Sequence, residues 1–177
     1  MTKIAIVTGA SRGFGRGTAR ILASEAGYKV YATARTESAL HSLQKEVAES
    51  NAAGEVIPVV LDQSDDEAVA EFVRRVSASE EKIDLLVNSA YAGLIAMTPH
   101  FGKPFWERPI SVFDGSMDIG VRGAYVMSAL VAPAMVKANN GLIVQISSYG
   151  GFAYVFDVGF GFGHDATGKF LARPPAT

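Results

Sequence analysis

The sequence predicts an α/β protein in which a doubly wound parallel sheet lies between two layers of helices. Five apolar strand candidates alternate with amphipathic helical segments, which is the pattern of a parallel sheet. A glycine-rich loop follows the first strand, at the place where such sheets turn from strand to helix. From these two observations we predict three layers and the strand order 3-2-1-4-5.

Each expected strand is a short run of apolar and β-branched residues. The five runs are Lys3 to Val7, Tyr28 to Ala34, Val56 to Leu61, Ile83 to Val87 and Leu142 to Ile146. The segments between them carry apolar residues at helical spacing. The expected helices are Phe14 to Ala26, Ser38 to Glu49, Asp65 to Ala78 and Val112 to Ala138, and in the last of them Pro133 is a possible point of interruption. The longest irregular stretch, residues 89–109, contains His100, Phe105 and Trp106.

Composition limits the class of protein and its partners. With 177 residues, of which 49% are hydrophobic and 19% charged, the chain 1–177 is expected to form one domain with a sizeable core. The net charge of −2, without a dense basic block, argues against nucleic acid or an anionic membrane as partner. No stretch reaches the roughly 18 apolar residues of a spanning helix, and the first apolar run is too short for a signal peptide.

The chain has no cysteine, so disulfides, thiolate metal ligands and a cysteine nucleophile are excluded. This composition fits a reducing compartment, and we expect a cytoplasmic protein. His41 and His100 have no nearby ligand pattern, and no metal site is expected.

The glycine loop reads Thr8-Gly9-Ala10-Ser11-Arg12-Gly13-Phe14-Gly15. Gly9 allows a sharp turn, Gly13 allows backbone to approach a pyrophosphate, and Gly15 allows the next helix to pack closely on the strand. That helix directs its N-terminus at the anion. The alternative for a glycine run taken alone is an ordinary tight turn.

Two further features lie at the ends of predicted strands. Asp62 follows the third strand, and the sequence Asn-Ser-Ala-Tyr-Ala-Gly, from Asn88 to Gly93, follows the fourth. Open α/β sheets bind ligands at the carboxyl ends of their strands. The three features together favour a nucleotide site over a simple turn.

The spacing G-x-x-x-G-x-G, with Asp62 and the Asn88 turn, resembles the short-chain dehydrogenase/reductase family, whose members have a Rossmann fold. Further motifs narrow the resemblance to one branch of that family: Phe105-Trp106-Glu107, Gly120-Val121-Arg122-Gly123 and Ile146-Ser147-Ser148. The resemblance extends from residue 1 to about residue 171 and implies an oxidoreductase that binds a nicotinamide dinucleotide and acts on a small carbonyl or alcohol. The cofactor-binding residues that it implies are Gly9, Ser11, Arg12, Gly13, Phe14, Gly15, Arg35, Asp62, Asn88 and Ala90.

Two arginines favour NADP(H) over NAD(H). Arg12 lies inside the glycine loop, and Arg35 follows the second strand, where NAD-binding members of the family usually have an acidic residue. A guanidinium group suits a 2′-phosphate. The alternative is that both arginines are solvated surface charges.

The family's catalytic signature is broken in this sequence. Ser148 matches the serine that orients the substrate carbonyl, but Phe160 and His164 occupy the positions of the family's acid/base tyrosine and ribose-binding lysine, and Gly120 that of its relay asparagine. Phenylalanine cannot carry a proton. His164 is the candidate for a substitute acid, and the alternative is a polar residue at a helix start with no catalytic role. The alternative for Ser148 is a hydroxyl that satisfies the backbone at a strand end.

Members of the family that this sequence resembles continue beyond this point, whereas the chain ends at Pro174-Pro175-Ala176-Thr177. We therefore expect a fold truncated at its C-terminus, with the last strand near an open edge. Three hypotheses follow: an oxidoreductase with altered catalysis, a cofactor-binding pseudoenzyme, and a truncated or frame-shifted product. The substrate is not indicated, and a homo-oligomer is left open.

Overall fold

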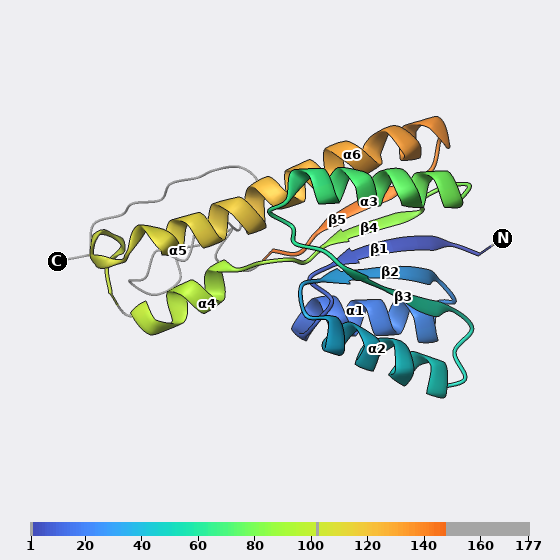
Figure 1. The fold of residues 1–177 in the computed structure, drawn as a ribbon, viewed down its shortest axis with the longest axis horizontal. Helices are drawn as coiled ribbons and strands as arrows, with labels where there is room; N and C mark the ends of the chain where they lie inside the picture. The colour runs from blue at the N-terminus through green and yellow to red at the C-terminus, as the bar shows by residue number, and fades with distance from the viewer. Residues whose placement is uncertain (1, 102, 148–177) are drawn as a thin grey trace. The chain divides into compact units, whose positions relative to one another are not determined.

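The computed structural model describes residues 2–101 and 103–147, and its central feature is a five-stranded parallel sheet (Figure 1). Its strands are β1 (Ile4–Thr8), β2 (Lys29–Ala34), β3 (Glu55–Val60), β4 (Leu85–Asn88) and β5 (Leu142–Gln145). Their order is β3-β2-β1-β4-β5, which confirms the predicted order. The predicted strands are all present, and their ends differ from the predicted ones by at most two residues.

The central strand β1 pairs with β2 on one side and with β4 on the other, so that Ile6 lies opposite both Tyr31 and Leu86. Successive side chains of a strand point to opposite faces. Accordingly, Ala5 and Val7 pack in one core and Ile6 packs in the other. Both faces of the sheet are therefore covered, as a sheet of near-continuous apolar strands requires.

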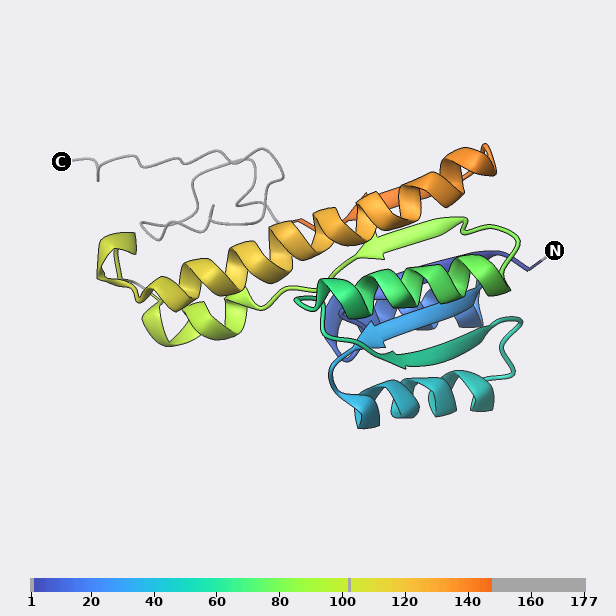
Figure 2. The same ribbon diagram turned by 45° about the horizontal axis from the view of Figure 1, so that its top comes forward.

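Two pairs of helices provide these covers (Figure 1). One face is covered by α1 (Gly13–Ser24) and α2 (Glu37–Glu49), which contribute Ala19, Ala23, Leu40, Leu43 and Val47 to the core. The other is covered by α3 (Asp66–Ser79) and α6 (Ala124–Lys137), which contact each other and are seen from a second direction in Figure 2. They contribute Phe72, Val76, Met127, Val131 and Met135 to the second core. The three expected layers are thus present.

Pro133, the possible point of interruption, does not break the helix, and α6 continues through this residue. Proline removes a hydrogen bond from a helix interior, but Val131 and Met135 are buried on either side of it, and this packing holds the helix together. The irregularity lies earlier in the chain. Between α5 (Ile110–Asp114) and α6, the segment η3 (Gly115–Gly123) is a π-helix.

The described chain divides into two compact units. Residues 2–90 and 124–146 form the sheet and its four helices, and residues 91–123 belong to the second unit. The second unit corrects the expectation of an irregular stretch at residues 89–109, because short helices form there. They are α4 (Gly93–Met97), η1 (Thr98–His100) and η2 (Phe105–Glu107), followed by α5 and η3.

Within the described residues, the continuous helical stretch Ile110–Lys137 contains an 18-residue window of mean hydropathy 1.5, which is enough to cross a membrane by length and composition alone. This corrects the expectation that no stretch reaches that size. The expectation counted apolar residues, whereas a mean hydropathy tolerates interspersed glycine and serine. In α6, Met127, Val131 and Met135 are buried against the sheet, whereas only 22% of the hydrophobic window as a whole is buried.

Candidate functional site

The glycine loop is shaped by its contact with the end of β4. Gly9 has a φ of +68°, a conformation that side chains disfavour. A Cβ added to Gly9 would lie 2.8 Å from the Cα of Ala90 and 2.9 Å from the carbonyl oxygen of Ser89. Only glycine therefore allows the loop to pass this close to the residues that follow β4.

Thr8 fastens the same two segments together. Its Oγ1 accepts hydrogen bonds from the backbone N–H groups of Ser89, at 3.0 Å, and Ala90, at 3.1 Å. On the other side, the N–H of Ala10 donates to the carbonyl of Thr33 at 3.0 Å. The loop is thus held between the carboxyl ends of β2 and β4. Sequence reasoning did not single out Thr8, and its position directly before Gly9 was the available signal.

The start of α1 leaves space and donors for an anion. Gly13 has a φ of +56°, and a Cβ built on it would have no heavy atom within 4 Å. At Gly15, in contrast, a Cβ would overlap the carbonyl of Gly9, so this glycine lets α1 pack on the loop. The N-cap residue Arg12 makes no side-chain capping bond, and the first turn of α1 carries no acidic residue. Free N–H groups at a helix N-terminus bind phosphate.

Arg35 and Asp62 lie together beyond the ends of β2 and β3. Arg35 Nη1 is 3.8 Å from Asp62 Oδ2, and the side chain of Arg35 is 66% exposed. Asp62 Oδ1 accepts bonds from the backbone N–H of Ser64, at 2.9 Å, and from its hydroxyl, at 2.7 Å. These bonds lower the pKa of Asp62 below its ordinary value; burial opposes them, and the charge of Arg35 adds to them.

The remaining candidates near the loop differ in exposure. Arg12 and Phe14 are exposed, whereas Ser11 and Ala90 are partly buried. Asn88 is buried, and its Nδ2 donates to Ser128 Oγ at 3.0 Å. Its Oδ1 has no hydrogen-bond partner among the described residues. The structure therefore gathers the predicted cofactor-binding residues of the first unit at the carboxyl ends of four strands.

In the second unit, the same motif continues with a tyrosine that sequence reasoning did not assign. Tyr91 OH lies 3.2 Å from Ser116 Oγ, and Ser116 Oγ donates to the carbonyl of Val112 at 3.0 Å. Burial raises the pKa of Tyr91 above its ordinary value, and the contact with Ser116 acts in the opposite direction. A side chain at Gly93 would overlap both hydroxyl groups.

The predicted catalytic residues Ser148, Phe160 and His164 lie outside the described residues. Gly120, aligned with the relay asparagine, lies in the π-helix η3. Among the described residues, no group of three or more His, Asp or Glu side chains is placed to hold a metal ion.

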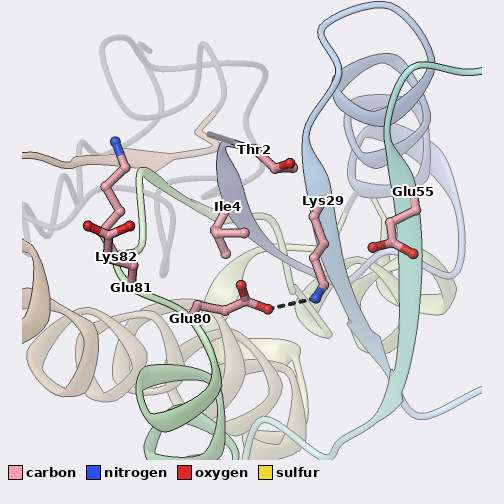
Figure 3. A pocket seen from close by; sticks show the side chains of 7 residues that line it. All are labelled: Thr2, Ile4, Lys29, Glu55, Glu80, Glu81 and Lys82. Atoms are coloured by element: carbon pink, nitrogen blue, oxygen red, sulfur yellow. Dashed lines mark ion pairs between the residues drawn. The ribbon is translucent and has the colours of Figure 1, made fainter.

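A cavity of about 330 Å³ lies at the opposite edge of the sheet, where β1, β2 and β3 begin (Figure 3). Lys29 and Glu80 meet across it at 2.8 Å, and Tyr31 OH donates to Glu80 at 2.5 Å. These charged groups satisfy one another. Because the cavity lies where the strands begin, it is separate from the glycine loop, which lies at their carboxyl ends.

Comparison with known proteins decides the family. The model of the short chain dehydrogenase family matches residues 3–159. The chain belongs to the short-chain dehydrogenase family. The match to this family does not reach Phe160 or His164.

Individual short-chain dehydrogenases agree with this assignment. Dehydrogenase/reductase SDR family member 1 of Homo sapiens is 40% identical over 171 residues, which cover 96% of this chain and 54% of that protein. An NADP-dependent 3-hydroxy acid dehydrogenase of Salmonella typhi is 32% identical over 148 residues, 84% of this chain and 55% of that protein. The resemblance to the branch of SDR family member 1 is thus confirmed.

A solved structure gives the same result for the fold. A metagenomic short-chain oxidoreductase in complex with NADP superposes with a TM-score of 0.76 at 34% identity, covering 88% of this chain and 66% of that one. The chain spans about half the length of the curated relatives that it matches.

Proposed function

We propose that this chain binds NADP(H) at the glycine loop and functions in an oxidoreductase reaction on a carbonyl or alcohol substrate. The observation that carries the proposal is the loop between β1 and α1. Its positive-φ glycines place open backbone at Gly13 beside an uncapped helix N-terminus. A pyrophosphate needs these two features, close backbone approach and free N–H donors.

The residues around the loop fit the rest of a dinucleotide. Gly9 shapes the loop, Gly13 leaves space for the pyrophosphate, and Asp62 and Asn88 lie at the ends of the neighbouring strands. In this family the bound nicotinamide supplies or accepts a hydride. The residues described here would bind and orient the cofactor, and Ser148 would orient the substrate carbonyl.

The preference for NADP(H) rests on arginine. The guanidinium group of Arg35 is exposed beside the end of β2, and Arg12 is exposed within the loop. Arginine can donate two parallel hydrogen bonds to a phosphate. The Salmonella relative is described as NADP-dependent and the metagenomic relative was solved with NADP, which supports the same preference here.

Titration of the chain with NADPH and NADH tests the preference. We expect NADPH to bind at least about tenfold more tightly, because one charge-assisted hydrogen bond contributes about 1.5–3 kcal/mol. Arg35→Ala should remove most of this difference, while Arg74→Ala, which changes an arginine paired with Glu71 on α3, should leave it unchanged. Equal affinities of the unchanged chain for the two cofactors would contradict the preference.

Binding without turnover is the second candidate function, and the sequence at two positions favours it. Phe160 has no hydroxyl to act as acid or base, and His164 stands where the family has its lysine. General acid–base catalysis contributes about 10²–10⁴-fold to a rate. A chain that binds NADPH but lacks this contribution would act as a cofactor-binding protein.

An assay of carbonyl reduction separates the two functions. With NADPH bound, we expect negligible turnover of a panel of aldehydes and ketones by the unchanged chain. The double substitution Phe160→Tyr with His164→Lys should raise the rate, since it restores the acid and its orienting cation. Clear turnover by the unchanged chain that disappears in His164→Ala would show instead that His164 transfers the proton.

A further inference from the structure

One hydroxyl group joins the carboxyl ends of β4 and β5 to helix α6. Ser128 Oγ donates to the carbonyl of Ala124 at 2.7 Å and accepts from Asn88 Nδ2 at 3.0 Å. Gln145 Nε2, from the last residue of β5, lies 3.4 Å from the same oxygen. A hydroxyl has one donor and two acceptor lone pairs. These three contacts use all of them.

Asn88 depends on this contact. It is 4% exposed, and its Oδ1 has no partner among the described residues. Its Nδ2 has one other acceptor there, the carbonyl of Ala124 at the long distance of 3.5 Å. Removing the hydroxyl of Ser128 would leave the buried amide of Asn88 with almost no hydrogen bonds. A buried polar group without a hydrogen-bond partner lowers the stability of the folded state.

The two anchored side chains lie directly before the points where the chain leaves the sheet, and the segment after Asn88 forms part of the candidate site. Asn88 precedes Ser89 and Ala90, whose N–H groups bind Thr8 at the glycine loop. Gln145 precedes Ile146, whose N–H donates to the carbonyl of Asn88 at 3.0 Å. The hydroxyl on α6 therefore fixes the ends of two strands at the point where the chain leaves the sheet.

We propose that Ser128 is a positioning residue, which sets the ends of β4 and β5 for cofactor binding through Asn88 and Gln145. The link to cofactor binding rests on the proposed function, whereas the effect on the strand ends does not. Ser128 is not assigned a contact with the cofactor. Its role is to hold other groups, so it must be tested by what those groups do.

The first measurement is the affinity for NADPH, read from the fluorescence of the bound cofactor. Ser128→Ala and Ser128→Val should raise the Kd about tenfold, the effect of losing one buried hydrogen bond. Ser128→Thr keeps the hydroxyl and has the shape of valine, so it should retain the affinity of the unchanged chain. Ser24→Ala is the matched control, because Ser24 Oγ also bonds the carbonyl four residues earlier, at 2.8 Å, but on α1.

The second measurement is amide hydrogen exchange of the chain without cofactor. In Ser128→Ala and Ser128→Val, the protection of the Ile146 amide should fall about tenfold as the strand end opens locally, while amides between β2 and β3 keep theirs. If the unchanged chain does not bind NADPH, the proposed function fails and exchange alone decides the role of Ser128.

Three results would overturn the role of Ser128. The first is an unchanged exchange rate of the Ile146 amide in Ser128→Ala. The second is that Ser128→Thr and Ser128→Val have the same NADPH affinity and the same exchange at Ile146. The third is that Ser128→Ala lowers the protection of Ile146 but leaves the NADPH affinity unchanged, in a chain that binds NADPH. The last result would show a contact that stabilises the fold without positioning the site.

Discussion

At the scale of single residues, Gly9 and Thr8 decide how the glycine loop meets β4. Thr8 is 1% exposed and binds two backbone N–H groups, and the absence of a side chain at Gly9 lets the segments approach. The Thr8 side chain is a buried acceptor, and its backbone pairs with Thr33 of β2, so the strand continues one residue beyond its apolar run. The loop is thus held before any ligand binds.

Gly9→Ala should lower the free energy of unfolding by about 2–4 kcal/mol, because it adds backbone strain at positive φ and overlap with Ala90. It should also weaken NADPH binding. Urea unfolding measures the first effect and cofactor titration the second.

Gly17→Ala supplies the control, on the helix that follows the loop. Gly17 lies inside α1, and a Cβ built there would have no heavy atom within 4 Å. Alanine should therefore stabilise the chain by about 0.5–1 kcal/mol. If the two variants unfold at the same urea concentration, the tight approach at Gly9 is not present in solution.

At the scale of elements, a single carboxylate joins the beginnings of three strands. Asp84 lies directly before β4. Its Oδ2 accepts a hydrogen bond from the N–H of Ile4, the first residue of β1, at 2.9 Å, and its Oδ1 accepts one from Nδ2 of Asn140, just before β5, at 2.8 Å. Lys82 Nζ lies 3.0 Å from Oδ1. Burial raises the pKa of Asp84, but the contacts with Ile4, Lys82 and Asn140 outweigh it, so the pKa lies below its ordinary value.

A lowered pKa in the folded state means that ionised Asp84 stabilises the fold above the unfolded-state pKa of about 3.9, and that this contribution disappears as the pH falls through the folded pKa. Asp84→Asn should cost about 1–3 kcal/mol at pH 7, because one donor loses its acceptor. The difference from the unchanged chain should narrow below about pH 4.

Urea unfolding at several pH values checks this behaviour. Glu71→Gln is the comparison, since Glu71 also has a lowered pKa, caused first by its hydrogen bond with Arg74, but lies on an exposed helix face. It should change stability less than Asp84→Asn at pH 7. A cost of Asp84→Asn that is the same at pH 7 and pH 3 would argue against an ionised clamp.

The strands could be predicted because they are short apolar runs, fully buried in β1 and mostly buried in β2 and β4. Their order followed from the glycine loop after the first of them. The predicted ends of the strands were less accurate where a polar residue is buried. Thr8 and Asn88 are the last residues of β1 and β4, and their side chains form hydrogen bonds with neighbouring segments. From the sequence alone, a polar residue at these positions indicates the start of a loop. The π-helix η3 had no local signal in the sequence.

The candidate site was predictable to the extent that it follows a motif. Gly9, Gly13 and Gly15 occupy a recognisable spacing, and their conformations fit it. Ser128 lies in an apolar helix 40 residues after Asn88, and only the three-dimensional contact connects them. The pairing of Arg35 with Asp62 was hidden for the same reason.

At the scale of the whole molecule, cofactor binding should raise the free energy of unfolding. A ligand that binds only the folded state adds about 2.7 kcal/mol when its concentration is 100 times the Kd. For a chain of this length this corresponds to a rise in Tm of about 5–10 °C. A thermal scan with NADPH measures it, and NADH at the same concentration should give a smaller rise. An unchanged Tm at millimolar NADPH would contradict binding to the folded chain.

The central strand also determines the order in which the sheet can be completed during synthesis. β1 pairs with β2, which follows soon after it, and with β4, and the contact between Ile4 and Asp84 spans 80 positions. A ribosome that adds about 5–20 residues per second needs roughly 4–16 s to cross that interval. Until then one edge of β1, with the apolar sequence Ile4-Ala5-Ile6-Val7, has no strand beside it, and unpaired apolar edges attract other chains. The nascent chain is therefore most vulnerable to mispairing in the seconds before residues 85–88 leave the ribosome.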